Sequence, residues 1–344
     1  MTIIAYFCII NINFKQPKMD KPYVIGIDMG GTNTAFGVVD RRGEILFRGS
    51  INTLENSKKE SYIKWEDYVA DLIKAINNLI EVNDLKDMIK GIGMGVPNGN
   101  MNDGTIENAA NIPWAKGVVV PLIKEMEIKT GLRCKLTNDA NAAAMGEMAY
   151  GAAKGMKDFI EITLGTGVGS GIVSNGQLVV GHDGFAGELG HVRVIRENGR
   201  HCGCGRTGCL ETYTSATGVA RTAREYLEMY PERESVLRDI QHRPITSKDV
   251  YEAAKKGDKP AIDVFNFTGR ILGEAFSNFV AFSSPKAIIL FGGLADAGDF
   301  LLEPLKKAMN ENMLFVYKGK TKIIISELNN AVAAILGASA LAWE

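Results

Sequence analysis

The sequence contains little cysteine and almost no excess charge. Five of the 344 residues are cysteine, too few for the disulfide framework of a secreted domain, so a reducing, cytoplasmic compartment is expected. The formal net charge is -1 at pH 7, and no long basic run occurs, which argues against a nucleic-acid partner. Hydrophobic residues make up 46% of the chain, enough at this length for two domains with separate cores.

The first ten residues are apolar but lack the features of a targeting segment. They carry no basic region and no small-residue cleavage site, and the run is too short to span a bilayer. The sequence therefore favours an N-terminal extension over residues 1–21, without a membrane partner, rather than a signal peptide. Because Met19 stands just before the first convincing strand, we interpret residues 1–18 as a stretch upstream of the usual start.

Three of the five cysteines lie in one glycine-rich loop, as Cys202, Cys204 and Cys209. With His191 they supply the four sulfur and nitrogen ligands of a tetrahedral zinc site, and His201 is an alternative fourth ligand. No position is left open for a substrate, so the metal is expected to be structural and to stabilise the folded loop. Three ordinary buried cysteines in a glycine-rich turn are the alternative interpretation.

One spacing, G-T-x-x-x-x-G-apolar-V, occurs twice, at Gly31–Val39 and Gly165–Val173. Each copy follows an apolar strand, Val24–Asp28 or Phe159–Leu164, and each leads through a glycine turn to a third strand. The matched context favours an internal duplication over two coincidental hairpins. Two related domains would then hold the phosphates of one nucleotide between their glycine-threonine turns.

Polar residues follow two further strands. The strand Cys134–Thr137 runs into an alanine-rich helix with Asn138 and Asp139 at the junction. Either side chain can cap the helix, and a carboxylate there can also accept the proton of a substrate hydroxyl. The strand Lys90–Pro97 ends in a polar loop over residues 98–103, which is a candidate substrate wall or simply a solvated turn.

Hydrophobic periodicity predicts an amphipathic helix over about residues 62–81. A strand at Lys286–Phe291 ends in Gly292 and Gly293, where the adenosine half of a nucleotide can approach closely, although a plain helix start is also open. The other predicted elements are helices at Thr217–Glu228, Ser247–Lys256 with Ser247 as cap, and Ala261–Phe282, a strand at Thr321–Ser326, and a closing helix that Asn330 caps and that runs through Leu341.

Taken together, residues 23–344 resemble the ROK family of bacterial sugar kinases and repressors, in the actin-like ATPase superfamily. The most specific part of the resemblance is Glu188-Leu-Gly-His191 followed by Cys202-x-Cys204-Gly-x-x-Gly-Cys209-x-Glu211. The resemblance implies an α/β fold of two duplicated RNase H-like domains with a central cleft and a small zinc-binding loop. The implied domains are a smaller one over 22–137 plus 328–344 and a larger one over 138–327, with the zinc loop at 191–211.

The resemblance also implies a role for individual residues. Asp139 becomes the general base on the sugar hydroxyl, and His191 serves twice, with one ring nitrogen on zinc and the other directed to the sugar. The implied sugar-binding residues are Gly99, Asn100, Asn138, Glu188, His191 and Glu211. The expected nucleotide-binding residues are Asp28, Gly30, Gly31, Thr32, Asn33, Thr166, Gly167, Gly169, Gly292 and Gly293.

The expected function is therefore transfer of the γ-phosphate of ATP, with bound Mg²⁺, to a hexose hydroxyl, with glucose as the favoured substrate. A kinase for N-acetylmannosamine, N-acetylglucosamine or fructose is the nearest alternative. A sugar-responsive repressor is disfavoured, because it requires an N-terminal helix-turn-helix and about 20 poorly patterned residues precede the first strand. A structural ATPase of the superfamily gives no reason for the zinc loop. The resemblance also implies a homodimer.

Overall fold

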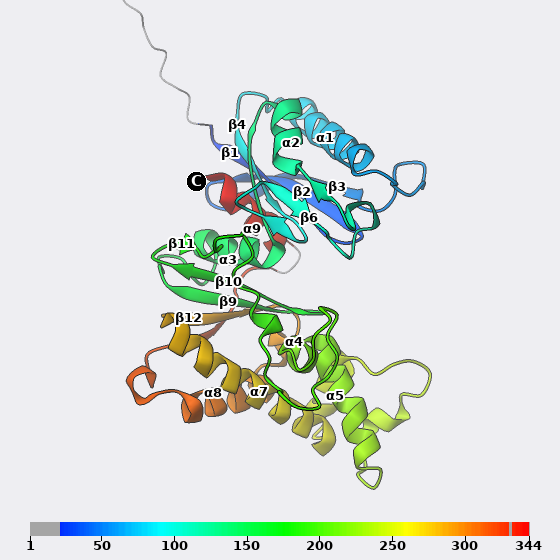
Figure 1. Cartoon of the computed structure of the whole chain (residues 1–344), viewed down its shortest axis with the longest axis vertical. Coiled ribbons are helices and arrows are strands. Elements are labelled where there is room, and N and C mark those ends of the chain that lie inside the picture. Colours follow the sequence, from blue (N-terminus) through cyan, green and yellow to red (C-terminus); the bar gives the residue numbers. More distant parts are fainter. Residues whose placement is uncertain (1–20, 330–331, 344) are drawn as a thin grey trace, which may run out of the picture.

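The protein has two lobes, each built on a mixed five-stranded sheet (Figure 1). The structure is a computed structural model that describes residues 21–329 and 332–343. The expectations for residues 1–18, for the rest of the predicted extension up to residue 20, and for Asn330 as a helix cap lie outside the described residues.

The first sheet has the strand order β3-β2-β1-β4-β8. Strands β1, β2 and β3 are antiparallel, which confirms the predicted meander, whereas β4 and β8 run parallel to β1. Helices α1 and α2 belong to the same lobe, and the fully buried Tyr68 of α1 joins its core. The bounds are β1 Tyr23–Met29, β2 Asn33–Asp40, β3 Ile45–Asn52, β4 Ile89–Gly95, β8 Arg133–Thr137, α1 Trp65–Val82 and α2 Leu122–Thr130.

The helix predicted over about 62–81 begins three residues later than expected, at Trp65. Lys64 has an extended backbone and marks the start. Tyr62 still joins the core, because its ring is buried and its hydroxyl donates a hydrogen bond to Asp71 at 2.8 Å. Buried apolar positions at helical spacing therefore begin before the helix does, in the extended segment that leads into it.

The second sheet repeats the order and the strand directions of the first, as β11-β10-β9-β12-β13. Helices α5, α6, α7 and α8 share one hydrophobic core with this sheet. The bounds are β9 Phe159–Leu164, β10 Val168–Ser174, β11 Gln177–Leu178, β12 Ala287–Phe291, β13 Lys322–Ile325, α4 Glu211–Thr214, α5 Ala216–Met229, α6 Ser247–Lys255, α7 Lys259–Ser283 and α8 Asp299–Asn312.

Two details of this lobe correct the sequence-based expectations. Thr246, not Ser247, caps α6, because the Thr246 hydroxyl accepts the Asp249 amide while the Asp249 carboxylate accepts the Thr246 amide. This reciprocal pair satisfies two backbone donors at once. After β12, the Gly292-Gly293 turn leads to a short 3-10 turn at Ala295–Ala297, and α8 begins only at Asp299.

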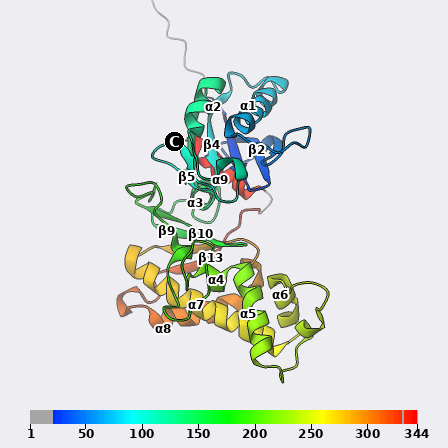
Figure 2. The ribbon, with the colours of Figure 1, turned by 45° about the vertical axis from the view of Figure 1, so that its right-hand side comes forward.

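Helices α3 (Asp139–Tyr150) and α9 (Ala333–Trp343) pack together between the two sheets (Figures 1 and 2). Their crossing is close, since a Cβ atom on Gly146 would lie 2.8 Å from the Cα atom of Gly337. Helix α9 lies on the first sheet, where a Cβ atom on Gly26 would lie 2.1 Å from the Ile335 carbonyl oxygen. Helix α3 contacts β9 and β10 of the second sheet, so this pair of helices joins the lobes.

The remaining regular elements are short. A three-stranded sheet, ordered β5-β6-β7, lies in the first lobe. None of the helices within the described ranges is long and apolar enough to cross a membrane. The bounds are β5 Gly99–Asn100, β6 Thr105–Glu107 and β7 Val119–Val120, with further 3-10 turns at Pro113–Ala115, Leu189–His191, Val236–Asp239 and Phe315–Tyr317.

Candidate active site and metal centre

A cleft of about 1290 Å³ is lined by residues of both lobes. Eleven of the residues that the sequence predicted for the site line this cleft, and they come from segments spread over most of the chain. They are Asp28, Asn138, Asp139, Thr166, Gly167, Gly169, Glu188, His191, Cys202, Cys204 and Glu211. The structure therefore gathers most of the predicted site in one place.

Asn138 and Asp139 have different structural roles at the start of α3. The Asn138 side chain is the cap, because its Oδ1 atom accepts the Asn141 amide at 2.7 Å. Asp139 is the first helical residue, and its Oδ1 atom accepts the Ala140 amide at 2.9 Å. Its side chain keeps access to solvent through the cleft while protein surrounds it on other sides. That burial raises the pKa of Asp139, although the Ala140 hydrogen bond opposes the shift.

Asp28, near the end of β1, faces the same cleft. Burial, and after it the negative charge of Asp139, raises the pKa of Asp28 to about 6. Each carboxylate therefore makes ionisation of the other more costly. Two acidic groups with raised pKa values in one cleft are typical of a catalytic site, and a cation between them would relieve the repulsion.

The second glycine-threonine turn is held by side chains and amides from α4 and α5. Glu211, the first residue of α4, accepts the Val168 amide with its Oε2 atom at 3.0 Å. The Ala216 amide donates to the Gly165 carbonyl, and the Thr217 hydroxyl donates to the Thr166 carbonyl, both at 2.8 Å. This turn thus lies at the cleft, and contacts from α4 and α5 fix its backbone.

The first turn, Gly30–Asn33, is fixed mainly by its own lobe. Its Gly30 amide donates to the Asn33 carbonyl at 3.0 Å. Thr53 contributes two more bonds, from its amide to the Thr32 carbonyl and from its hydroxyl to the Gly30 carbonyl, both at 2.9 Å. Asp28 lines the cleft, whereas the four residues of this turn are not among the described residues that do so.

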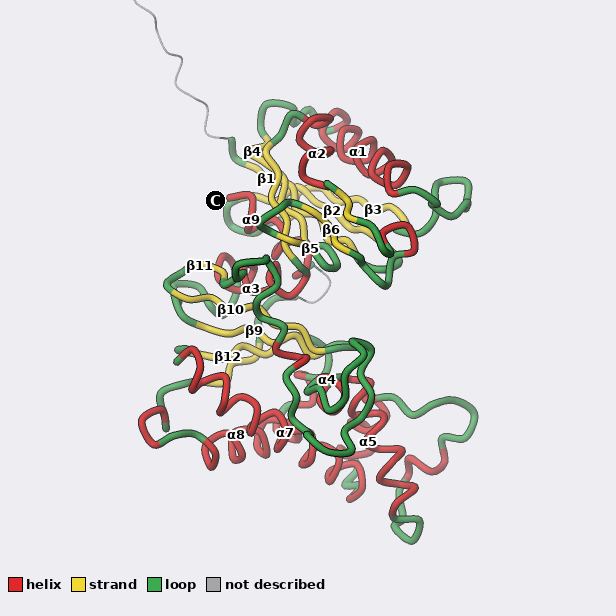
Figure 3. Tube along the Cα trace, viewed as in Figure 1, coloured by secondary structure: helices red, strands yellow, loops and turns green. Residues whose placement is uncertain are grey.

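The three cysteines of the loop and His191 converge on one point. Apart from the 3-10 turn at Leu189–His191, the chain between β11 and α4 is loop (Figure 3). The ligand atoms of His191, Cys202, Cys204 and Cys209 lie within 4.8 Å of one another. The Cys202 sulfur is 3.6 Å from His191 Nδ1, and the Cys204 and Cys209 sulfurs are also 3.6 Å apart. A tetrahedral ion with bonds of about 2.3 Å places its sulfur ligands about 3.8 Å apart, so the cluster has the dimensions of a zinc site.

His191, and not His201, joins this cluster among the described residues. His201 instead forms an isolated bridge with Thr207. With Nδ1 of His191 facing Cys202, its Nε2 atom lies 3.9 Å from Glu188 Oε2. Glu211 also approaches the cluster, because its Oε1 atom accepts the Cys202 thiol at 3.6 Å. The four residues of the cluster and two predicted sugar ligands, Glu188 and Glu211, are therefore one connected group.

Besides Cys209 and the four residues of the first turn, four predicted site residues lie outside the set that lines the cleft. Gly99 and Asn100 form the buried strand β5, and the Asn100 amide nitrogen donates to Glu107 and to the Asp183 carbonyl. Gly292 and Gly293 lie beside the second turn, since a Cβ atom on Gly292 would meet the Leu164 carbonyl oxygen at 2.7 Å. Gly99 and Asn100 are thus buried, whereas Gly293 is exposed to solvent.

The cleft also includes residues that sequence reasoning missed. Thr217, Arg221 and Arg224 of α5 face it, although that segment had been identified only as a helix. No local pattern marks these three, because their place in the cleft depends on how α5 packs below the second turn. Asn98, in the loop that the sequence predicted as a candidate substrate wall, also lines the cleft, as do Asn111 and Phe185.

Comparison with known proteins identifies the family. The sequence pattern of the ROK family matches residues 24–344. A glucokinase of Halalkalibacterium halodurans is 38% identical and is aligned over 93% of this chain and 94% of its own length. A glucokinase of Thermotoga maritima is 33% identical over 95% of this chain and 99% of its own length.

A solved structure gives the same result. The crystal structure of a ROK family glucokinase from Streptomyces griseus, in complex with glucose and AMPPNP, is 33% identical, with a TM-score of 0.72. The alignment covers 93% of this chain and 98% of that chain. With the family pattern matched over nearly all of its length, the chain is a member of the ROK family.

Proposed function

We propose that this protein is an ATP-dependent glucokinase that phosphorylates glucose to glucose 6-phosphate. The observation that carries the proposal is the Asp139 carboxyl group, which lines one cleft together with His191, Glu188 and the Thr166–Gly169 turn. A general base between a sugar subsite and a phosphate subsite is the arrangement that phosphoryl transfer to a hydroxyl needs. Relatives at 33–38% identity that are named glucokinases support this choice of substrate.

In this proposal Asp139 accepts the proton of the reacting hydroxyl. Its raised pKa makes the carboxylate a stronger base than an exposed aspartate. Asn138 orients the sugar with its amide nitrogen only, because its oxygen is committed to capping α3. Glu188, His191 and Glu211 bind the ring hydroxyls, and the hydrogen bond from Ala140 fixes the direction of the Asp139 carboxylate.

The second turn and Asp28 form the nucleotide side of the proposed site. Backbone amides of the turn would hold the phosphates, and the packing of α4 and α5 fixes the turn in place before substrate arrives. The neighbouring carboxyl groups of Asp28 and Asp139 fit a divalent cation, since carboxylate oxygens are preferred ligands of Mg²⁺. When bound with ATP, Mg²⁺ neutralises charge on the phosphates.

We further propose that the cluster of His191 and three cysteines holds a structural zinc ion. Its spacing and its all-protein donor set of three sulfurs and one nitrogen fit zinc. The ion contributes folding energy to the loop. In the chain, His191 bonds the cluster through Nδ1, which leaves Nε2 directed toward Glu188 and the sugar side.

The proposal also includes the domain division, the compartment and the assembly. The two sheets share strand order and directions, which supports a duplication with domains at 22–137 plus 328–344 and at 138–327. A cytoplasmic homodimer rests on the family resemblance and on the low cysteine content. Light scattering on the purified chain measures the assembly directly.

The decisive experiment measures ADP release by the purified chain with MgATP and each of five sugars. These are glucose, mannose, fructose, N-acetylglucosamine and N-acetylmannosamine. We expect the highest kcat/KM for glucose. Preference for an acetylated sugar would keep the mechanism and change the substrate, in line with the N-acetyl-D-glucosamine kinases of Vibrio cholerae and Mannheimia succiniciproducens, each 28% identical to this chain.

The Asp139→Asn variant tests the base. We expect kcat to fall by about 10² to 10⁴-fold, because the amide accepts no proton, while glucose still binds. Calorimetric titration with glucose measures that binding. Asp263→Asn is the control, since Asp263 forms a half-exposed ion pair with Arg233 and does not line the cleft. Turnover close to that of the unmodified protein in Asp139→Asn would remove Asp139 as the base.

A further inference from the structure

Arg200 is a buried cation in the metal-binding loop that the proposed mechanism does not use. It precedes Cys202 by two positions, and its side chain is 8% exposed. It is not among the residues that line the cleft. A buried guanidinium group is costly unless its donors are paired, so its partners indicate what it is for.

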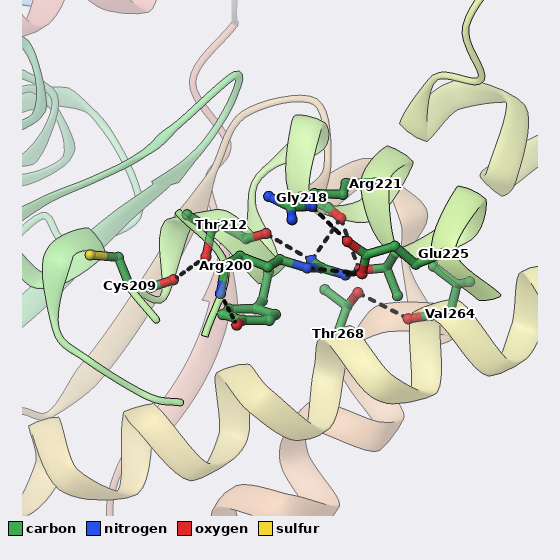
Figure 4. Close-up of polar contacts among 10 residues, drawn as sticks. Arg200, Cys209, Thr212, Gly218, Arg221, Glu225, Val264 and Thr268 are labelled. Atoms are coloured by element: carbon green, nitrogen blue, oxygen red, sulfur yellow. Dashed lines mark hydrogen bonds and ion pairs between the residues drawn. The ribbon is translucent and has the colours of Figure 1, made fainter. Parts of the chain in front are cut away.

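All five N–H donors of Arg200 have acceptors (Figure 4). Nε and Nη2 donate to the Glu225 carboxylate at 3.1 and 2.5 Å. Nη1 donates to the carbonyls of Thr212 and Gly218 at 2.8 and 3.4 Å. Nη2 also donates to the Thr222 hydroxyl at 2.9 Å. The side chain therefore joins α4, through Thr212, to the first three turns of α5.

The backbone of Arg200 is tied to the same structure. Its amide donates to the Tyr213 hydroxyl at 2.8 Å, and its carbonyl accepts the Gly208 amide at 2.9 Å. The guanidinium carbon lies 4.5 Å from the centroid of the Tyr213 ring. Gly208 immediately precedes Cys209. Arg200 therefore connects the two ends of the segment that carries the three cysteines to α4.

The two helices that Arg200 joins are those that hold the second turn. Glu211 of α4 accepts the Val168 amide, and Ala216 and Thr217 at the start of α5 donate to the Gly165 and Thr166 carbonyls. A shift of either helix relative to the loop would move these bonds. The loop in turn carries His191 on the sugar side.

We propose that Arg200 is a positioning residue that sets the nucleotide subsite by locking the metal loop to the α4–α5 junction. It acts through Glu211 and Thr217 and touches neither substrate. The inference rests on the proposed function for the identity of the nucleotide, but it concerns binding of that nucleotide and not the transfer step. These five hydrogen bonds require the planar guanidinium group of arginine, and the ammonium group of lysine does not supply the same set of donors.

The test compares Arg200→Lys with Arg233→Lys. Arg233 lies beyond the other end of α5, and it likewise contacts tyrosine rings and a carboxylate, that of Asp263. Calorimetry measures the Kd of Mg·AMPPNP below the melting temperature of each variant, and atomic absorption measures zinc. We expect the Kd to rise about tenfold in Arg200→Lys, as the turn loses its alignment, and to stay within about twofold in Arg233→Lys. Zinc content should be unchanged in both.

An unchanged Kd in Arg200→Lys, or an equal rise in both variants, would overturn the proposal and leave Arg200 with a role in stability alone. If Arg200→Lys does not fold, Glu225→Gln carries the test, because that side chain is 41% exposed and keeps its volume. We then expect a Kd rise of about threefold, since the amide keeps one acceptor oxygen but weakens the contacts of Glu225 with Arg200 and with Arg221. If the unmodified chain binds Mg·AMPPNP but phosphorylates no sugar, the proposed function is refuted. The Kd values of the Arg200 and Arg233 variants still test the role of Arg200 in that case.

Discussion

The two glycine-threonine turns have the same sequence spacing and lie at the same place in two sheets of equal strand order, yet they are supported differently. The first turn, Gly30–Asn33, is bonded to itself and to Thr53 at the end of the neighbouring β3. The second turn is bonded to Glu211 and Thr217, which follow it by more than forty residues in the chain. Its shape therefore depends on the loop and helices inserted between β11 and β12.

Two copies of one sequence motif are therefore held in place by different parts of the structure. The short connection after β3 in the first lobe leads directly to α1, whereas the connection after β11 in the second lobe contains the metal cluster, α4 and α5. The second copy thus has a source of rigid support that the first copy lacks. We expect substitutions in that support to affect the nucleotide side selectively.

Among the changes that separate the two turns, loss of the Cys/His cluster should reduce activity most. Cys209 is fully buried and lies two positions before Glu211, so Cys209→Ser should release the proposed zinc ion and weaken the support of the second turn together. We expect kcat/KM to fall by about 100-fold or more, the upper range for disturbed metal sites. Zinc analysis and the ADP assay measure the two effects.

The matched control for the metal cluster is Cys134→Ala, in the buried strand β8 of the other lobe. Its zinc content should equal that of the unmodified chain. If Cys209→Ser loses its metal but keeps its activity, the cluster does not support the second turn.

The strands that lead into the two turns also differ, at Gly26 and Glu161. These residues pair across their hairpins with the equivalent glycines Gly37 and Gly171. Gly26 allows α9 to pack against the sheet, whereas Glu161 is fully buried and neither of its carboxyl oxygens has a hydrogen-bond partner in the described part of the chain. Burial, and then the charges of Glu147 and Asp139 on α3, raises the pKa of Glu161 well above 4.5.

The raised pKa of Glu161 predicts a specific pH dependence of stability. Below about pH 4.5 both states hold the proton, and the group has no effect on the free energy of unfolding. As the pH rises, the unfolded state loses this proton first, so stability falls by about 1.4 kcal/mol per pH unit until the folded-state pKa is reached. Glu161→Gln should remove that loss, so that its stability advantage over the unmodified chain grows from pH 4.5 upward.

Urea unfolding at a series of pH values measures this difference, with the exposed Glu81→Gln as control. An advantage of Glu161→Gln that does not change with pH would show that Glu161 ionises as easily in the folded chain as in the unfolded one. Subtraction between the two proteins removes the contributions of Asp139 and Glu147, whose pKa values burial also raises.

A pair of glycine substitutions compares the turns directly. A Cβ atom on Gly167 would lie 2.3 Å from Glu211 Oε2, so Gly167→Ala should push that carboxylate off the Val168 amide. A Cβ atom on Gly31 would have no neighbour closer than 3.8 Å. We expect the KM for MgATP to rise about tenfold in Gly167→Ala and less than about twofold in Gly31→Ala. Equal effects would mean that the Glu211 contact does not set the shape of the second turn.

Sequence reasoning predicted those parts of the site that depend on local pattern. The β1–β2–β3 meander and the cluster of cysteines follow from strand periodicity and short spacings, and the structure contains both. The choice between His191 and His201 as fourth member of the cluster needed the fold of the loop, because both lie near Cys202 in sequence. Asn138 and Asp139 were equal candidates for the helix cap until the hydrogen bonds distinguished them.

The parts that sequence reasoning missed depend on contacts between distant segments. Nothing in the local sequence of Arg200 indicates that it would bridge two helices. Nor does the sequence around Glu161 indicate that its carboxyl group would be buried with no hydrogen-bond partner among the described residues. The burial of Asn100 behind the cleft likewise depends on Glu107 and Asp183, one of them in a separate loop. Such pairings follow from packing of the whole chain and have no short-range signature.

The smallest expected effect concerns Thr217, whose hydroxyl donates one exposed hydrogen bond to the Thr166 carbonyl. Thr217→Val keeps the shape of the side chain and removes that bond together with the one to the Ser215 hydroxyl at 2.9 Å, so the free energy of unfolding should fall by about 0.5–1.5 kcal/mol. Thr32→Val is the matched change in the first turn, where the threonine hydroxyl has no hydrogen-bond partner within residues 21–329 and 332–343. We expect urea unfolding to show no loss there. A loss of the same size in both variants would mean that side chains support the two turns equally, and the asymmetry would then rest on Glu211 alone.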